Sequence, residues 1–472
     1  MTNTTVPSAP PSAAHPLPPS PPSHPLFGLM REFRQDRIGL YRRVARDYGD
    51  VLRMRYLWVN TYTVSHPDDM RHVLVENNHN YVRNPFVNDV FKLFLGDGLF
   101  TMDGESWLSR RRLMQPAFHR QRLAGLGTLM TDAAEAMLAD WAQWDDGQEI
   151  AVDEEMMKVT LRVVGQALFS VDLLGAARAL GDAFTGVSEF VNYRMNTPFP
   201  PPLWVPTRRN RQFKAALATL DRTVYSIIAE RKKTGTHLSE QMRIDKEEKG
   251  DLLDMLMAAR DADTGAGMTD AELRNEVALL IFAGHETTAT TLTWAFYLLS
   301  QHPEAEAKLH AELATVLGGR TPTLADLPNL PYNRMVIEET MRLYPPAWGV
   351  SRKSVAADVI GGYQLPANAS LTLPITTLHH DPRWWEQPER FDPERFTPER
   401  SANRHKFAYL PFGAGPRQCI GNNFALMEAQ LVLATVAQRY QLRLRPGHPV
   451  QPDPVFVLRT SHGLPMTVTR RG

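Results

Sequence analysis

The chain has 472 residues and carries 52 basic and 52 acidic side chains, so its formal net charge is zero. With 43% hydrophobic and 22% charged residues, its composition is that of an ordinary globular protein, which excludes wholesale disorder, a collagen-like repeat and a polybasic nucleic-acid-binding protein. The only cysteine, Cys419, excludes an intramolecular disulfide, a multi-cysteine zinc site and an iron–sulfur cluster. A reducing, cytoplasmic location fits this cysteine content.

Residues 1–25 form a leader in which nine prolines are mixed with Ser, Ala and Thr. A segment of this composition cannot build a core, and we predict that it is disordered or polyproline-like. It lacks the charged and then apolar pattern of a signal peptide, and no uncharged apolar run in the chain reaches 18 residues. We therefore expect no transmembrane segment.

After the leader, the spacing of apolar residues predicts a mainly helical protein with a few strands. The longest predicted helix is Thr269–Gln301, where Thr269 and Glu272 form a capping box and Pro303 follows the end. At 1.5 Å per residue this helix is ~50 Å long and crosses the whole molecule. The other predicted elements are helices at Gln35–Tyr48, Leu203–Lys232, Tyr332–Tyr344 and Asn422–Tyr440, and strands at Val51–Tyr56 and Thr61–Ser65.

Cys419 lies in a loop that runs from Phe412 to Gly421 and reads FGAGPRQCIG. Three glycines and a proline predict a tight turn whose backbone can approach a partner closely. The loop leads into the last predicted helix, so Cys419 lies at a helix N-terminus beside Arg417, and both favour the thiolate. A lone cysteine is more often a buried apolar residue, but a thiolate here is a nucleophile or a soft metal ligand. The loop holds no base for a nucleophile, whereas an axial ligand to haem iron needs none.

This loop resembles the FGxGxRxCxG haem-binding signature of the cytochrome P450 monooxygenases at every fixed position. The resemblance extends from about Pro25 to Arg470. It implies a haem b cofactor with Cys419 as the iron ligand, and Phe412, Arg417 and Gly421 as further cofactor-binding residues. It also implies the cytochrome P450 fold, mainly α with a minor β component, in which the long helix and the cysteine loop enclose the haem.

A second motif, AGHETT, lies in the middle of the long predicted helix. A charged residue and hydroxyls inside a buried helix are costly unless they are satisfied or used. By itself, Thr287 could simply donate to a carbonyl of the preceding turn. The string is similar to the family's oxygen-activation motif, which implies that Glu286 and Thr287 deliver protons during oxygen activation and that Gly284 makes room for the haem.

The third motif is Glu339-Thr-Met-Arg342. An isolated acid–base pair three residues apart is usually exposed and weak. The string resembles the family's ExxR motif, whose network has a structural role and includes a second arginine. We assign that arginine to Arg395 rather than to Arg390 in the near-copy PERF at 388–391, because the family's segment lies nearer the cysteine.

The fourth motif is Trp107-Leu-Ser-Arg-Arg111, which resembles the family's WxxxR helix. Trp107 and Arg111 share a helix face, which suits an indole donor and a cation that meet a carboxylate. A plain cation–π pair is the alternative. The family also places an arginine that binds a haem propionate on the strand after the ExxR helix, which here is Arg352.

The resemblance implies a haem-thiolate monooxygenase that inserts one oxygen atom from O2 into a C–H bond of a lipophilic substrate, either terpenoid or carotenoid-like or a fatty acid. Length alone allows about three domains, but one haem domain over residues 26–472 is expected after the leader. Two alternatives stay open: a peroxygenase that uses hydrogen peroxide, and a non-enzymatic haem sensor or carrier. The pair Glu286–Thr287 favours the monooxygenase over both.

Electrons are expected from a separate ferredoxin or flavin reductase, because the chain has neither a phosphate-binding glycine loop nor a spare cysteine. Local positive charge beneath Cys419 would steer such a donor, although a merely solvated surface is the alternative. We expect a monomer whose apolar Phe199–Trp204 loop contacts a membrane peripherally. The candidate docking cations are Arg110, Arg112, Arg404 and Lys406, the expected substrate-lining segments are Pro85–Phe100, Pro198–Pro206 and Ala347–Val350, and Arg194 is a possible anchor for a carboxylate.

Overall fold

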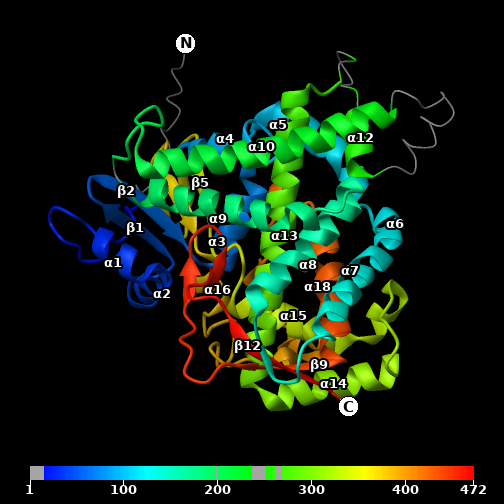
Figure 1. The fold of residues 1–472 in the computed structure, drawn as a ribbon. Coiled ribbons are helices and arrows are strands. Elements are labelled where there is room, and N and C mark those ends of the chain that lie inside the picture. Colours follow the sequence, from blue (N-terminus) through cyan, green and yellow to red (C-terminus); the bar gives the residue numbers. More distant parts are fainter. Residues whose placement is uncertain are drawn as a thin grey trace, which may run out of the picture.

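The computed structural model describes residues 15–197, 199–235, 251–258, 260, 265 and 267–471. Most of this chain is helical, and the helices surround α13, which runs through the middle of the molecule (Figure 1). The helices are α1 (Met30–Gln35), α2 (Arg37–Tyr48), α3 (Pro67–Arg71), α4 (Pro85–Leu95), α5 (Gly104–Met114), α6 (Arg120–Leu123), α7 (Gly127–Trp141), α8 (Val152–Phe169), α9 (Leu174–Asn196), α10 (Arg208–Gly235), α12 (Leu252–Ala258), α13 (Asp270–Gln301), α14 (Pro303–Leu317), α15 (Pro331–Leu343), α16 (Ile375–His379), α17 (Pro398–Ser401) and α18 (Asn422–Ala437).

The strands form small sheets at the edge of the helical body (Figure 1). The largest sheet has the order β1-β2-β8-β5-β3, in which β2 pairs in parallel with β8 and the other neighbours are antiparallel. The strands are β1 (Val51–Tyr56), β2 (Val59–Val64), β3 (Tyr81–Val82), β4 (Gln148–Ala151), β5 (Val350–Ser354), β6 (Asp358–Ile360), β7 (Tyr363–Leu365), β8 (Ser370–Leu373), β9 (Tyr440–Leu444), β10 (Pro452–Pro454), β11 (Leu458–Thr460) and β12 (Pro465–Arg470). The prediction of a mainly α protein with a minor β component is confirmed.

Helix α13 begins where its capping box predicts. Thr269 Oγ1 accepts from the Glu272 amide, and the Glu272 carboxylate accepts from the Thr269 amide, so two otherwise unpaired N–H groups are satisfied. From Leu273 to Leu299 nearly all of its side chains are buried. Helix α8 packs along it, and Thr160 of α8 donates to the His285 carbonyl at 3.0 Å. A helix that is apolar on all sides requires such complete enclosure.

Several predicted boundaries differ from the structure: the helix predicted at Leu203–Lys232 is α10, Arg208–Gly235, and two further differences have local reasons. The turn between the first two strands is Leu57–Trp58, with Leu57 at φ 55°, so β2 starts at Val59 rather than Thr61. At the other end of the chain, α18 stops at Ala437, because Tyr440 already pairs with Arg470 in β9 and β12.

The predicted leader needs a correction within the described residues. Residues 1–14 lie outside these residues, but residues 15–25 run along the β1 sheet and are held there. The Arg53 amide donates to the Pro19 carbonyl at 2.8 Å, and the Gln364 amide donates to the Pro16 carbonyl at 2.9 Å. Because polyproline backbone keeps its carbonyls free, it can accept hydrogen bonds from strand residues. The folded part therefore starts before residue 26.

One large apolar core spans the chain from Val90 to Val468, and a second, smaller core lies under the largest sheet. Within the described part of the chain, we find no helix of sufficient length and apolarity to cross a bilayer.

Candidate active site

The cysteine loop is held by backbone contacts that only glycine allows. The Cys419 amide donates to the Phe412 carbonyl at 3.0 Å, which closes the loop. Gly415 has φ 71°, and a Cβ atom there would lie 1.9 Å from the Leu74 carbonyl oxygen. The dense glycines of the signature therefore have a steric cause: the loop turns in the left-handed region and presses against another backbone segment.

Cys419 has accessible surface, yet protein atoms surround its sulfur and burial raises the pKa of the thiol. A sulfur that faces an internal cavity has both properties. The Gly421 amide and the Arg111 guanidinium act in the opposite direction and lower this pKa. The sequence assigned that electrostatic role to Arg417, which was wrong: the Arg417 side chain turns away to pair with Asp103.

The middle of α13 presents one accessible strip in an otherwise buried helix. Ala283 is exposed and Gly284 and Thr287 are partly exposed, whereas Phe282, His285 and Glu286 are buried. Ala283 and Thr287 are four residues apart and share a face. Thr287 Oγ1 donates to the Ala283 carbonyl at 2.8 Å. These residues are accessible although the helix around them is buried, and Ala283 is a member of this strip that the sequence reasoning missed.

Gly284 has a packing reason that the sequence did not indicate. A Cβ atom at this position would lie 2.8 Å from Cγ2 of Val164 on α8. The glycine therefore allows α8 and α13 to approach closely. Its predicted place beside the cofactor stays a prediction.

Glu286 is a buried carboxyl group whose Oε2 has no hydrogen-bond partner within the described structure. Burial raises its pKa to about 7, against the opposing effect of Arg459 on β11. A carboxyl group with this pKa takes up and releases protons near neutral pH. Arg459 lies 173 residues after Glu286 in the sequence, and no local pattern pointed to it.

A cluster of three arginines lies between α5, β5 and the cysteine loop. Arg417 pairs with Asp103, and its guanidinium carbon lies 4.3 Å from the centroid of the Trp107 ring. Burial and the nearby cations lower the pKa of Arg352 to about 10 and that of Arg83 to about 9. Asp103 is the one carboxylate that opposes both shifts, so the cluster has an excess of positive charge.

This excess of cations suits an anionic group with two carboxylates, such as the two propionates of haem. Arg352 and Arg417 were predicted from the sequence, whereas Arg83 was missed because it belongs to no motif. The predicted binding of a common carboxylate by Trp107 and Arg111 stays a prediction. Trp107 lies under Arg417, and Arg111 lies within electrostatic reach of Cys419.

Glu339, Arg342 and Arg395 meet in the core. Arg342 donates to both oxygens of Glu339 at 2.7 and 2.8 Å, and Arg395 Nε donates to the Glu339 Oε1 at 3.3 Å. Arg342 also donates to the carbonyls of His379 and Pro388 at 2.8 Å each. The network thus ties α15 to the irregular segment that precedes the cysteine loop. The side chain of Arg390, from the near-copy of the motif, is exposed.

Aromatic rings gather next to the accessible strip of α13. The ring of Phe282, which precedes Ala283, lies 5.1 Å from Phe94 and 4.9 Å from Phe456. Phe91 lies 4.8 Å from Phe456 and 5.1 Å from Phe100. The predicted segment Pro85–Phe100 therefore lines an apolar region, and Phe456, from the turn between β10 and β11, completes it without having been predicted.

The donor set fits haem. Cys419 has accessible surface, three cations cluster beside its loop, and α13 presents an accessible strip with the Thr287 hydroxyl next to the buried acid Glu286. A family model described as Cytochrome P450 matches residues 18–465.

The chain belongs to the cytochrome P450 family.

Known proteins that this cytochrome P450 resembles support the assignment. Cyclooctatin synthase from Streptomyces melanosporofaciens is 38% identical over 87% of this chain and 87% of its own length. Cyclooctat-9-en-7-ol 5-monooxygenase from the same organism is 34% identical over 93% of this chain and 92% of its own length. The crystal structure of the cytochrome P450DA heme domain superposes with a TM-score of 0.84 at 26% identity, covering 97% of this chain and 99% of that chain. The protein is a cytochrome P450 monooxygenase that carries haem and oxidises lipophilic substrates.

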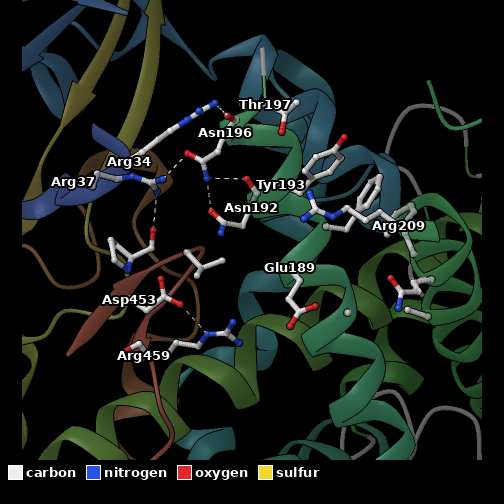
Figure 2. Close-up of a pocket in the computed structure, with 18 of the residues that line it drawn as sticks. Arg34, Arg37, Glu189, Asn192, Tyr193, Asn196, Thr197, Arg209, Asp453 and Arg459 are labelled. Carbon is white, nitrogen blue, oxygen red and sulfur yellow. Dashed lines mark hydrogen bonds and ion pairs between the residues drawn. The ribbon is translucent and has the colours of Figure 1, made fainter. Parts of the chain in front are cut away.

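A cavity of about 1290 Å³, lined by both polar and apolar residues, opens between α9, α10, the α1–α2 segment and the β10–β11 hairpin (Figure 2). Arg37 crosses it: Nη2 donates to Asn196 Oδ1 at 2.8 Å and Nη1 to the Pro454 carbonyl at 2.7 Å. Asp453 and Arg459 form an ion pair at 3.7 Å on the hairpin side. Because Arg459 also lowers the pKa of Glu286, the hairpin connects this cavity with the acid of α13.

Two of the four predicted docking cations are engaged by other groups within this cytochrome P450. Arg110 pairs with Glu272 at 2.8 Å and with buried Glu276 at 3.3 Å. Arg404 stacks on Trp385 at 4.2 Å and donates to the Arg395 carbonyl. Neither guanidinium is free to meet a partner, so both assignments were wrong. Arg112 and Lys406 are exposed.

Proposed function

We propose that this cytochrome P450 hydroxylates a terpenoid substrate with electrons from a separate redox protein. The observation that carries the proposal is that one fold has accessible surface at Cys419 and at Ala283, Gly284 and Thr287, next to the buried Glu286. A site that only bound haem would not need a buried carboxyl group with a pKa near neutrality. A peroxygenase, which uses hydrogen peroxide directly, would not need this pair either.

Haem b is held at two places in this proposal. Cys419 provides the thiolate ligand, and Arg83, Arg352 and Arg417 bind the propionates. When bound, haem b supplies the iron chemistry that activates O2. The network of Glu339, Arg342 and Arg395 keeps the segment before the cysteine loop in place.

The protein moves protons through Glu286 and Thr287. Glu286 is half protonated near neutral pH and has a free Oε2 within the described structure, so it can carry a proton from solvent into the helix. Thr287 Oγ1 lies on the accessible strip with Ala283 and can hold a water molecule there. The buried surroundings exclude bulk water from this path.

The substrate is bound by the phenylalanines around Ala283, which favour a rigid apolar molecule. A terpenoid is preferred over a fatty acid for two reasons. The predicted carboxylate anchor Arg194 already donates to the Pro201 carbonyl at 3.1 Å. In addition, a relative that matches 93% of this chain is named for the oxidation of cyclooctat-9-en-7-ol.

Electrons come from a ferredoxin or flavin protein that docks near α5, where Arg112 is exposed next to Arg111. Arg111 lies within electrostatic reach of Cys419, which places this surface close to the cysteine. We place the enzyme in the cytoplasm, because a lone cysteine suits a reducing compartment.

The test starts with the reduced carbon monoxide complex. The wild-type protein should give the spectrum of a thiolate-ligated haem, and Cys419→Ser should lose it while still binding haem. A retained thiolate spectrum in the variant would refute the ligand assignment. Soret titrations with terpene alcohols and with fatty acids then separate the substrate classes. Turnover that requires an added reductase indicates a monooxygenase, and turnover with hydrogen peroxide alone indicates a peroxygenase. No turnover under either condition indicates a haem carrier.

A further inference from the structure

Three consecutive side chains of α13 hold the backbone of the segment that joins α4 to α5. The first two bind carbonyl groups: Arg274 Nη1 donates to the Phe94 carbonyl at 2.6 Å, and Asn275 Nδ2 donates to the Asp97 carbonyl at 3.1 Å. The Phe94 carbonyl belongs to the last turn of α4, whose carbonyls have no partner within the helix. Arg274 Nε also donates to Asp221 of α10 at 2.7 Å, so its guanidinium is fixed from two sides.

The third side chain, Glu276, is buried and binds an amide. Its two carboxylate oxygens accept from the Leu99 amide at 3.0 and 3.2 Å, and Oε1 lies 3.3 Å from Arg110 Nη1 on α5. Burial and the neighbouring Glu272 raise the pKa of Glu276 to about 7, whereas Arg110 and the Leu99 amide act against this rise. A buried carboxylate is costly unless such partners meet it. This group therefore joins α13 to α5 and to the segment between α4 and α5.

The segment approaches α13 closely because it contains two glycines. A Cβ atom at Gly96 would lie 2.4 Å from Asn275 Oδ1, and one at Gly98 would lie 3.2 Å from Glu276 Oε1. Thr101 holds the segment from its other side, since its Oγ1 donates to the Gly96 carbonyl at 2.6 Å and accepts from the Gly98 amide at 3.0 Å. The backbone between α4 and α5 is thus fixed from both sides.

The fixed segment carries two of the phenylalanines that line the apolar region beside α13. The ring of Phe94, at its start, lies 5.1 Å from that of Phe282, and the ring of Phe100, at its end, lies 5.1 Å from that of Phe91. The backbone groups that α13 binds include the carbonyl of Phe94 itself and the amide of Leu99, which directly precedes Phe100. The contacts from α13 therefore set where both rings stand.

We propose that Glu276 is a positioning residue that makes the substrate region selective for rigid, ring-shaped molecules. With the segment held, Phe94 and Phe100 form a wall of fixed shape, and a rigid molecule that matches it binds with little loss of its own freedom. With the segment released, both rings move, and a flexible chain adapts to the altered wall better than a rigid molecule does. The inference rests on the proposed function, which assigns these phenylalanines to the substrate.

Hydrogen exchange of the haem-loaded protein tests the contact without any ligand. At about pH 8, where Glu276 is mostly charged, the Leu99 amide of the wild type should exchange slowly, and in Glu276→Leu it should exchange about tenfold faster or more. Glu276→Gln keeps an oxygen that accepts from Leu99, and Arg110 keeps its ion pair with Glu272 at 2.8 Å. Exchange in this variant should stay within about threefold of the wild type. Equal acceleration in both variants would overturn the proposal.

Two synthetic imidazoles test the selectivity, because an imidazole binds haem iron whatever the natural substrate is. One carries a rigid adamantyl group and the other a flexible decyl chain, and Soret titration gives the Kd of each. Glu276→Leu should raise the Kd of the adamantyl compound, relative to that of the decyl compound, by about tenfold, which corresponds to a held wall that is populated at about one tenth. Glu276→Gln should restore the ratio to within about threefold of the wild type.

Glu306→Leu is the matched control. Glu306 on α14 is also a buried carboxylate with charged and polar partners, since Arg443 donates to it at 2.8 Å and Gln441 at 2.9 Å. This variant should lose stability without a change in the ratio of the two Kd values. An unchanged ratio in Glu276→Leu, or an equal change in the control, would overturn the proposal.

A second variant serves if Glu276→Leu retains no haem. Asn275→Ala removes the bond to the Asp97 carbonyl and should change the ratio in the same direction by about threefold, and an unchanged ratio there would equally overturn the proposal. Failure of the proposed function shows separately, as the absence of a Soret shift when the wild-type protein is titrated with terpene alcohols. The two imidazoles still report the effect of Glu276 in that case.

Discussion

The hydroxyl of Thr287 donates to the carbonyl of Ala283 at 2.8 Å, across the part of α13 that is accessible in the core. A hydroxyl that binds the carbonyl four residues earlier competes with the helix's own N–H donor and loosens that turn. It also places Oγ1 on the accessible strip of α13, whose other members, Ala283 and Gly284, are apolar. Thr287 therefore supplies the hydroxyl group of this strip.

Replacement of Thr287 by alanine removes this hydroxyl and keeps the helix. Product formation should fall by roughly 100-fold, the lower end of the range for a lost proton-transfer group, with the consumed electrons appearing as hydrogen peroxide. Thr287→Ser keeps the hydroxyl and should keep most of the coupling between electron use and product. Product and peroxide are measured per reductant consumed. Equal coupling in the alanine variant and the wild type would remove Thr287 from the proton path.

Arg459 lowers the pKa of Glu286, the buried acid of α13. Burial raises the pKa of Glu286 to about 7, and the positive charge of Arg459 acts against this rise. Without that charge the carboxylate is less stabilised, so the pKa rises further in Arg459→Gln. The inflection of kcat with pH should therefore move to higher pH.

The pH profile of Arg459→Gln is compared with that of Arg445→Gln. Arg445 is an exposed arginine that pairs with Glu149 at 3.2 Å, and its loss should leave the inflection in place. Glu286→Gln should abolish the inflection altogether. A downward shift in Arg459→Gln, or one of equal size in the control, would contradict the coupling.

Two glycines of the cysteine loop should respond differently to alanine. At Gly415 the φ of 71° strains any side chain, and the added Cβ would lie 1.9 Å from a backbone oxygen that cannot move freely. Gly415→Ala should lower the free energy of unfolding by about 2 kcal/mol or more and reduce haem content. At Gly421 the nearest atom is Phe118 Cε1 at 3.8 Å, so Gly421→Ala should change stability by no more than about 0.5 kcal/mol. Urea unfolding and the ratio of haem to protein provide both measurements, and equal losses would argue against this steric account.

Much of this site was predictable because its functional residues lie close together in short sequence motifs. Cys419 with its glycines, the pair Glu339 and Arg342, and the acid and hydroxyl of α13 each lie within one turn or one loop. Such patterns keep their geometry wherever the fold places them. The capping box at Thr269 likewise fixed the start of α13 correctly.

The residues that were missed come from segments that only the fold brings together. Arg83, Phe456 and Arg459 belong to no motif, and each reaches the site from a different part of the chain. The errors at Arg110 and Arg404 have the same cause. Arg110 looks like a surface cation until the fold places Glu276, more than 160 residues later, against it.

Arg112 remains as the sharpest test of the electron-donor surface. It is exposed on α5, next to Arg111, whereas Arg110 on the same helix is buried in its ion pairs. Arg112→Glu replaces attraction to an acidic donor by repulsion, so reduction should slow by roughly tenfold at low ionic strength and by less as salt screens the charge. The haem spectrum and the unfolding midpoint should not change, because the side chain is exposed. Arg46→Glu, at an exposed site on α2, should be reduced at the wild-type rate. If Arg112→Glu is reduced at the rate of the wild type and of Arg46→Glu at all salt concentrations, the docking surface lies elsewhere.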